Sequence, residues 1–353
     1  MVVKVFVVDD SAVVRQALAH MLAGNPEVEL IGSAPNPLLA MEMIRKNPPD
    51  VLLLDIEMPG MDGLTFLRQI MAGTPIPTVI CSTLSTEGSK VALEALSAGA
   101  VAILAKPKLG LKQHLEDSRR EMIQTLKTAA KSRPPARGSV LAAAAPKVTG
   151  QVSSLSAGVH AFAMNKPVVM GSSTGGTQAL ELVLTSLPAD APGIAITQHM
   201  PEKSTAMYAT RLNGICAMNV REAKDGDRLE RGVALIAPGG LHMQLRKAAG
   251  QYFVHVVDGP PVNRHKPSVD VLFRSAAECA GRDALGIIMT GMGDDGARGM
   301  KVMHDLGART IAQNEATCVV FGMPKEAIKL QAVDDILPLE QIARAILKFD
   351  SRA

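Results

Sequence analysis

A glycine-rich stretch has the residue types and spacing of a nucleophilic serine turn. Gly171, Ser173 and Gly175 match G-x-S-x-G, a pattern in which a serine lies on a sharp turn between a strand and a helix. The glycines let the backbone turn, and the N-terminal amides of the following helix can stabilise an oxyanion. The stretch lacks the lysine of a Walker A loop and the spacing of a dinucleotide fingerprint. Phosphate or nucleotide binding at Gly171–Gly176 remains an alternative.

Two other positions supply partners for this serine. His199 follows one apolar run and the pair Asp294–Asp295 follows another. In a serine hydrolase the serine attacks, a histidine accepts its proton, and an aspartate holds the imidazole in the required tautomer. The spacing alone does not decide between the two aspartates. The order Ser, His, Asp differs from the Ser, Asp, His of α/β-hydrolases, and His304, the only later histidine, falls in a predicted helix.

A second group of polar residues lies in the first 125 positions, at the carboxyl ends of predicted strands. Carboxylates of this kind bind Mg²⁺, which retains several waters and accepts a phosphate oxygen. One aspartate would then accept a phosphoryl group, while a lysine and a hydroxyl neutralise and hold the transferred oxygens. The acids are Asp9, Asp10 and Asp55, with Asp55 as the phosphoryl acceptor, the hydroxyl is Ser82 or Thr83, and the lysine is Lys106.

Alternating strands and helices must position the residues of this first group. Short apolar runs that alternate with helical periodicity are typical of a doubly wound parallel sheet, whose ligands bind at the carboxyl ends of the strands. A final helix is predicted over Leu111–Ala129. The strands are predicted at Val2–Val8, Val28–Gly32, Asp50–Asp55, Pro77–Cys81 and Ala100–Leu104.

The second half of the chain repeats this alternation around Ser173. We expect an α/β fold of two doubly wound parallel-sheet domains, the second with an antiparallel insertion. His242, His255 and His265 have no ligand spacing and are interpreted as structural or substrate-side. The strands are predicted at Pro167–Met170, Gly193–Thr197, Ala284–Thr290 and Thr310–Gln313, and the insertion at Val233–Ile236, His242–Leu245 and Tyr252–Val257.

Composition limits the function classes. The 353 residues suggest two domains, which we place at 1–126 and 166–350, joined by a flexible linker over 127–165. The net charge of +3 favours neither nucleic acid nor membrane binding, and no apolar run is long enough to span a bilayer. The four cysteines form no C-x-x-C pair, which suits a reducing compartment. We therefore expect a cytoplasmic protein without a leader peptide.

The first domain closely resembles a response-regulator receiver, a flavodoxin-like domain. The matching residues are Asp9-Asp10, Asp55 followed by Met58-Pro59-Gly60-Met61-Asp62-Gly63, and Lys106-Pro107. The resemblance implies phosphorylation of Asp55 with Mg²⁺ held by the acids. It places the hydroxyl switch on Ser82, with Thr83 as second choice, and implies a chemotaxis-type histidine kinase as phosphodonor.

The second domain, expected to be Rossmann-like, resembles the bacterial chemotaxis protein-glutamate methylesterases. The resemblance implies Ser173 as nucleophile, His199 as base, Asp295 as triad acid, and oxyanion support from Thr174 and the backbone near Met292. Ser172 stands where we expect alanine. The matching motifs are Gly171–Thr177, Thr197–Pro201, Ala237–Gly239, Arg264–Asp270 and Thr290–Gly296.

This resemblance implies a phosphorylation-activated hydrolase that removes methyl esters from glutamates of methyl-accepting chemotaxis receptors and deamidates specific glutamines. We expect Mg²⁺ in the receiver and no cofactor for the esterase. One alternative is a receiver-coupled scaffold that binds receptors through an inert hydrolase domain. Another is a DNA-binding regulator, but the sequence has no helix-turn-helix with a basic recognition helix.

Overall fold

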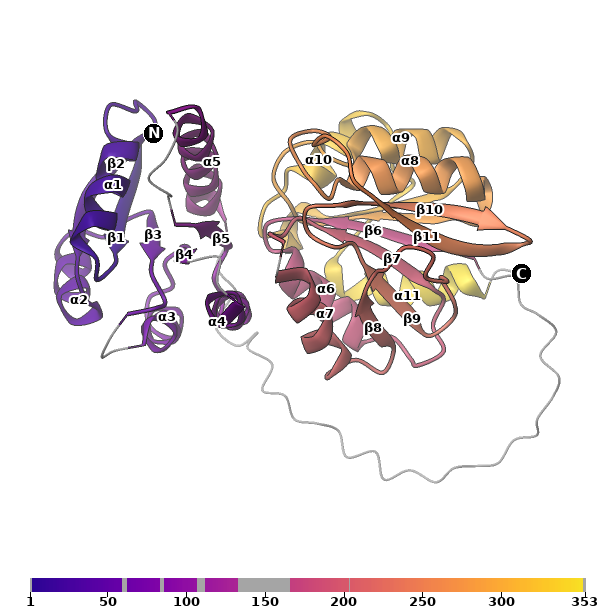
Figure 1. Cartoon of the computed structure of the whole chain (residues 1–353), viewed down its shortest axis with the longest axis horizontal. Helices are drawn as coiled ribbons and strands as arrows, with labels where there is room; N and C mark the ends of the chain where they lie inside the picture. Colours follow the sequence, from indigo (N-terminus) through magenta and orange to yellow (C-terminus); the bar gives the residue numbers. More distant parts are fainter. Residues whose placement is uncertain are drawn as a thin grey trace, which may run out of the picture.

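The computed structural model describes residues 2–58, 62–82, 86–106, 112–132, 166–202 and 204–351. Thr83, Pro107, the motif residues 59–61 and linker residues 133–165 lie outside the described residues. Both domains are doubly wound α/β units built on parallel sheets (Figure 1), which confirms the predicted fold class.

The receiver sheet has five parallel strands in the order β2-β1-β3-β4-β5. Its apolar strands are buried on both faces, because α1 and α5 cover one face and α2, α3 and α4 cover the other. The strands are β1 (Val3–Val8), β2 (Val28–Ala34), β3 (Val51–Leu54), β4 (Thr78–Ser82) and β5 (Ala102–Ala105). The helices are α1 (Ala12–Leu22), α2 (Pro37–Lys46), α3 (Gly63–Ala72), α4 (Thr86–Ser97) and α5 (Lys112–Lys131).

The second domain has a seven-stranded parallel sheet in the order β14-β13-β12-β6-β7-β9-β8. Helices α6, α7 and α11 cover one face, while α8, α9, α10 and the β10–β11 hairpin cover the other (Figure 1). The strands are β6 (Val168–Ser172), β7 (Ile194–Gln198), β8 (Asn219–Glu222), β9 (Val233–Ile236), β10 (His242–Ala248), β11 (Gln251–Val257), β12 (Leu285–Ile288), β13 (Arg309–Gln313) and β14 (Asp335–Leu337). The helices are α6 (Gly176–Thr185), α7 (Ser204–Asn213), α8 (Val269–Ala280), η1 (Gly281–Asp283), α9 (Ala297–Asp305), η2 (Glu315–Thr317), α10 (Met323–Lys329) and α11 (Leu339–Asp350).

The expected antiparallel insertion is smaller than the sequence indicated. Val233–Ile236 forms β9, which pairs in parallel with β7 inside the main sheet, so only β10 and β11 are antiparallel. A run of four apolar residues reveals that a strand is buried but not the direction of its neighbours, which explains the error. The prediction also missed β8 and β14, two short edge strands with mostly polar or partly exposed residues.

The expected linker begins too early at residue 127. Helix α5 continues to Lys131, because Leu126 and Ala129 repeat at helical spacing and are buried in the receiver core. Within the described residues, no helix combines the length and apolar character that crossing a membrane requires.

The receiver contacts the second domain through α4 and α5. Helix α4 packs against α6 and α7, and buried residues of both domains belong to one continuous apolar cluster. The Gln178 amide, on α6, donates to the carbonyls of Leu96 at 2.5 Å and Ala100 at 3.1 Å in the receiver. The contact between the domains therefore combines apolar packing with two hydrogen bonds from one side chain.

Candidate active site

The candidate catalytic residues follow three adjacent strands. Strand β6 lies between β12 and β7, and their carboxyl ends form one edge of the sheet. Ser173 follows β6 directly, His199 follows β7 directly, and Asp295 lies in the loop after β12. The chain runs outward from β6 in both directions, so this edge is the topological switch point at which ligands of open α/β sheets bind.

Ser173 is held on a sharp turn between β6 and α6. Gly175 takes the left-handed conformation at the helix N-cap, with φ of 77°. Gly171 lets α8 approach, because a Cβ there would lie 2.2 Å from a methyl group of Val269. The Ser173 amide donates to the Thr290 carbonyl at 3.0 Å, so this amide is already occupied. Thr174, the next residue, has the position from which an amide stabilises the oxyanion in such turns.

The two neighbouring hydroxyls of this turn have different surroundings. Ser172 is fully buried in β6, and its hydroxyl donates to Oε1 of Gln198 at 2.6 Å. Nε2 of Gln198 donates to the carbonyl of Ser173 at 2.9 Å. Ser173 is partly exposed. Ser172 therefore belongs to the support of the turn, whereas Ser173 lies where a substrate can reach it.

His199 and Asp295 form a direct pair. Nε2 of His199 lies 2.8 Å from Oδ2 of Asp295, and the two side chains are 8% and 0% exposed. Nδ1 of His199 is buried and has no hydrogen-bond partner among the described residues. With the Nε2 proton donated to Asp295, Nδ1 carries the lone pair that can accept a proton. Asp294, the alternative that the spacing left open, is exposed.

The carboxylate of Asp295 is enclosed by donors from residues 263–270. Oδ1 accepts hydrogen bonds from Asn263 at 2.9 Å and Ser268 at 2.8 Å, and Oδ2 accepts the amide of Val269 at 2.7 Å. Burial favours a higher pKa for Asp295, but the hydrogen bonds from His199, Asn263 and Ser268 outweigh it and hold this pKa well below its usual range. Asp295 is therefore a fixed anion facing the imidazole.

Sequence reasoning gave these supporting residues no role. Asn263 and Ser268 lie in or beside the motif that carried the family resemblance, yet their partner is far along the chain. The signal available was a serine at the start of a predicted helix, which ordinarily indicates an N-cap. Gln198 had a weaker signal, as a polar residue that ends a buried strand.

Met292 lies in the loop between β12 and α9 and is partly exposed. The preceding Gly291 is anchored, because its amide donates to Val320 and its carbonyl accepts the amides of Gly322 and Met323. The hydroxyl of Thr128, from receiver helix α5, lies against the sulfur of Met292. The receiver thus contacts the loop to which the resemblance assigned oxyanion support.

The expected phosphorylation residues meet at the carboxyl end of the receiver sheet. Nζ of Lys106 lies 2.7 Å from Oδ2 of Asp55 and 3.2 Å from Oδ2 of Asp9. Asp9 and Asp55 are buried, Asp10 is exposed, and Ser82 ends β4 as a buried residue. Burial raises the pKa of Asp9, and the attraction of Lys106 offsets this only in part.

The three aspartates fit a divalent metal such as Mg²⁺. Their ligand atoms lie within 4.8 Å of one another, and carboxylate oxygens are the donors that Mg²⁺ prefers. Oδ2 of Asp9 is buried and shares the ammonium of Lys106, 3.2 Å away, with Asp55, so a divalent cation would add to the compensation of these charges.

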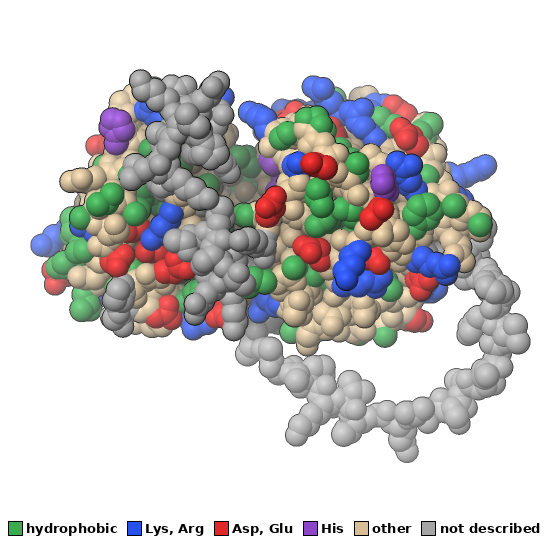
Figure 2. Space-filling model, in the orientation of Figure 1, with side chains coloured by type: hydrophobic (Ala, Val, Ile, Leu, Met, Phe, Trp, Pro, Cys, Tyr) green, Lys and Arg blue, Asp and Glu red, His purple; other side chains and the backbone are tan. Residues whose placement is uncertain are grey.

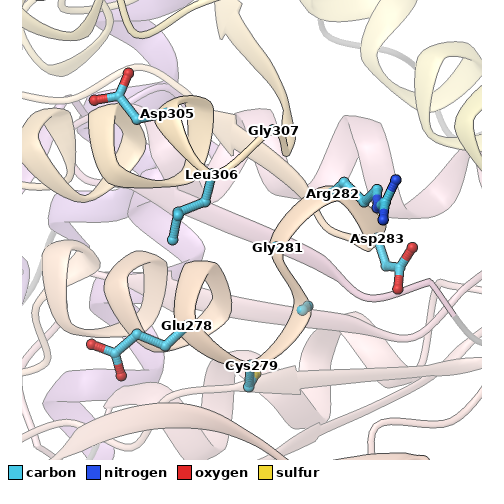
Figure 3. Close-up of a pocket in the computed structure, with 9 residues that line it drawn as sticks. Glu278, Cys279, Gly281, Arg282, Asp283, Asp305, Leu306 and Gly307 are labelled. Carbon is cyan, nitrogen blue, oxygen red and sulfur yellow. The ribbon is translucent and has the colours of Figure 1, made fainter.

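A separate pocket lies at the opposite edge of the catalytic sheet. It is formed where α8 and α9 end, before β12 and β13 begin, and includes Cys279, Arg282 and Leu306 (Figure 3). Ser173, His199 and Asp295 lie at the carboxyl ends of β6, β7 and β12, so this pocket is not part of the candidate active site.

Comparisons with known proteins identify the family of each domain. Residues 168–346 match the family described as CheB methylesterase, and residues 5–116 match the response regulator receiver domain. A protein-glutamate methylesterase/protein-glutamine glutaminase 2 of Dechloromonas aromatica is 56% identical over 98% of this chain and 98% of its own. A relative of the same name from Xanthomonas campestris is 57% identical over 97% of this chain and 99% of its own.

A solved structure gives the same result for the second domain. The CheB methylesterase catalytic domain of Thermotoga maritima is 36% identical, with a TM-score of 0.51, over 52% of this chain and 98% of that domain. The chain therefore belongs to the CheB methylesterase family and combines its catalytic domain with an N-terminal response-regulator receiver.

Proposed function

We propose that this chain hydrolyses γ-glutamyl methyl esters of methyl-accepting chemotaxis receptors, releases methanol, and deamidates specific receptor glutamines. The observation that carries the proposal is the His199–Asp295 pair, buried at the sheet edge where Ser173 lies partly exposed on its turn. Family membership and the names of the two relatives support the substrate class.

Acylation uses each of these groups in turn. Oγ of Ser173 attacks the ester carbonyl carbon while Nδ1 of His199 takes the hydroxyl proton. Nε2–H stays donated to Asp295, whose fixed charge stabilises the imidazolium. The oxyanion is assigned to the backbone at Thr174 and near Met292. Breaking the C–O bond returns the proton to the leaving oxygen and releases methanol. A base typically contributes about 10²–10⁴-fold and an oxyanion donor about 10²–10³-fold.

Deacylation repeats the proton transfers with water. His199 accepts a proton from water as the water oxygen attacks the acyl carbon, and then returns it to Oγ of Ser173. The glutamate carboxylate is released. With glutamine as substrate the leaving group is ammonia, and the acyl-enzyme is the same. We assign no cofactor to this reaction, because acid–base and covalent catalysis by the three side chains account for both steps.

Asp55 is the proposed phosphoryl acceptor. A chemotaxis-type histidine kinase is the proposed donor, and bound Mg²⁺ would neutralise charge on the transferred oxygens. Asp9, Asp10 and Asp55 would hold the ion, while Lys106, already paired with Asp55, would meet the phosphoryl oxygens. Ser82, with Thr83 as second choice, is the proposed hydroxyl switch.

The interface between the domains provides a route for regulation. Val319 packs against the receiver core on one side and would lie 2.5 Å from a Cβ at Gly175 on the other. Thr128 contacts Met292. Both contacts reach loops that border Ser173. A phosphate adds about 1.5–2 negative charges at Asp55, which can change how α4 and α5 pack. The unphosphorylated chain is proposed to be partly self-inhibited.

The remaining assignments follow from this proposal. The partners are the receptors and the kinase, in the cytoplasm, without membrane insertion. On the face shown in Figure 2, acidic and basic side chains are interspersed over the catalytic domain, which does not favour a nucleic-acid partner. The inert-scaffold alternative has no support in a site where Asp295 is held by several donors and paired with His199.

Methanol release from methylated receptors tests the proposal. Wild type, Ser173→Ala and Ser172→Ala are compared, each with and without acetyl phosphate. Ser173→Ala should abolish release, whereas Ser172→Ala should retain it, since Ser172 is buried and faces Gln198. Acetyl phosphate should stimulate the two active proteins. Wild type without methanol release under either condition would leave only the scaffold interpretation.

A further inference from the structure

His265 lies directly on the imidazole of His199. The ring centroids are 3.8 Å apart and the ring planes differ by 8°. Nδ1 of His265 is buried and lacks a hydrogen-bond partner among the described residues, as does Nδ1 of His199. The contact is therefore made by the ring faces.

The turn that carries His265 also carries a donor to the catalytic aspartate. Val262 and His265 exchange backbone hydrogen bonds of 3.1 and 2.9 Å, and the two residues between them have left-handed φ angles of 48° and 68°. This is the geometry of a type I′ turn. Such turns favour asparagine at their central positions, and Asn263 occupies one of them. The Asn263 amide reaches Asp295 while His265 reaches His199. One short turn thus touches both members of the pair.

A single hydrogen bond fixes only one point of the His199 ring. The Nε2–Asp295 contact leaves the ring free to rotate about its side-chain torsion, which would move Nδ1 relative to Ser173. A parallel ring at van der Waals distance opposes that rotation. Burial and the neighbouring His199 lower the pKa of His265 to about 4, so His265 is neutral near pH 7 and can face a cation without repulsion.

We propose that His265 is a positioning residue for the esterase reaction. Its stacked ring holds the His199 plane in which Nε2 faces Asp295 and Nδ1 is available to the nucleophile. Its neutral π face also stabilises the positive charge that His199 gains when Ser173 attacks. The inference rests on the proposed function, since it assigns His199 as the base.

The same groups suit this role better than metal binding. Ligand atoms of His199, His265 and Asp295 lie within 4.8 Å of one another. However, the in-plane lone pairs of two parallel rings run side by side instead of converging on one ion. The oxygens of Asp295 already accept hydrogen bonds from several donors. A bound metal would have to break the stacked arrangement and this network.

A series of substitutions at His265 in the full chain distinguishes two roles of this residue. In one role its flat ring supports His199, and in the other its ring nitrogens carry a proton. His265→Phe keeps the ring face without the nitrogens, His265→Leu keeps bulk without a flat π face, and His265→Ala removes both. Lys266→Ala is the matched control, because this neighbouring side chain is directed to Asp258 and Gly259. The measurements are kcat and KM for methanol release, and the rate at which a fluorophosphonate labels Ser173.

His265→Phe and Lys266→Ala should stay within about threefold of wild type in both rates. His265→Leu and His265→Ala should lower kcat and labelling by about 10–100-fold with KM nearly unchanged, the range that displacement of a catalytic group by about 1 Å can cost. The proposal fails if Phe is as slow as Ala, which would make His265 a proton carrier, or if Leu is as fast as wild type. If His265→Ala does not fold, the comparison of His265→Phe with His265→Leu still tests the proposal.

The labelling assay also separates this inference from the proposed function. A wild type that reacts with the fluorophosphonate but releases no methanol would contradict the receptor esterase assignment. The order of labelling rates across the series would still support or contradict the role of His265.

Discussion

Ser268 stands at the N-cap position of α8, but its hydroxyl donates to Oδ1 of Asp295 at 2.8 Å and makes no capping bond to its own helix. The carboxylate of Asp295 caps that helix instead, by accepting the amide of Val269 at 2.7 Å. The charge that orients His199 is therefore held by the first turn of another helix, whose dipole favours an anion there. The proposed catalytic geometry and the N-terminus of α8 depend on one carboxylate.

Ser268→Ala should lower both the stability of the fold and the rate of the proposed reaction. Removing one donor to a buried carboxylate should cost about 1–3 kcal/mol of unfolding free energy and lower kcat about 3–10-fold as Asp295 holds the imidazole less firmly. Urea unfolding and methanol release measure the two effects. Ser186→Ala is a control, because this exposed hydroxyl bonds only within α6 and its loss should leave kcat unchanged. A Ser268→Ala variant with wild-type kcat would show that Asp295 does not depend on this donor.

Local patterns were enough to predict the sheet edge that carries the candidate catalytic residues. The apolar strands before Ser173 and His199 were correctly placed, because buried parallel strands are continuous apolar runs that end at polar residues. The choice between Asp294 and Asp295 could not come from spacing, since both follow the same strand. It depends on burial, which the sequence does not reveal at a glycine-rich turn.

The contacts that support Asp295 and His199 could not be predicted from the sequence, for a different reason. Asn263 acts on Asp295 through a contact between residues 32 positions apart, and His265 acts on His199 through ring stacking. Neither contact leaves a periodic signal along the chain. The direction of β9 was likewise hidden, because four apolar residues suit either a parallel or an antiparallel neighbour.

The contact between Gln178 and the receiver predicts a change in basal activity. Its amide bonds two receiver carbonyls, and the loss of such bonds should destabilise the closed interface by about 1 kcal/mol. If this interface restrains the esterase, Gln178→Ala should raise unphosphorylated activity about fivefold, or up to the phosphorylated rate where that is lower, and leave the phosphorylated rate unchanged.

Thr185→Ala is the matched control for Gln178→Ala, since this exposed residue of α6 bonds only within its own helix. Both variants are assayed for methanol release with and without acetyl phosphate. Equal basal rates for Gln178→Ala and wild type would remove this contact from the regulatory mechanism. A fall in the phosphorylated rate would instead indicate damage to the catalytic domain.

The buried charge of Asp9 predicts a response to Mg²⁺. Asp9 is buried beside Asp55, and the two carboxylates share the ammonium of Lys106, so this site carries unfavourable negative charge that Lys106 offsets only in part. Mg²⁺ should raise the melting temperature of the wild type. Asp9→Asn should raise it in EDTA, by about 3 °C for each kcal/mol of relieved repulsion, and should remove the further rise with Mg²⁺. In Asp50→Asn, which alters a receiver aspartate bonded to Lys4, the Mg²⁺ response should persist. A full Mg²⁺ shift in Asp9→Asn would show that Asp9 is not a ligand.

The stacked histidine predicts how stability depends on pH. The pKa of His265 is about 4 in the folded chain against about 6.5 for an ordinary histidine, so between these values the unfolded chain binds more protons and unfolding becomes easier as pH falls. Asp295 acts in the same direction but at lower pH, because its pKa is also depressed in the folded chain. Its depressed pKa stabilises the fold above about pH 4, and that contribution disappears only at lower pH. The window from pH 6.5 to pH 4 therefore contains the decline due to His265, which a comparison with a His265 variant isolates from other groups such as Asp9, whose pKa is raised.

His265→Phe should flatten the decline in this window while keeping the stacked ring. Each unit of pKa difference corresponds to about 1.4 kcal/mol, so the wild type should lose at most about 3 kcal/mol more unfolding free energy than His265→Phe between pH 7 and pH 4. Urea titrations at several pH values measure the two slopes, with Lys266→Ala expected to follow the wild type. Identical slopes in wild type and His265→Phe would mean that His265 takes up protons freely in the folded chain, and its neutral face could then not support the imidazolium of His199.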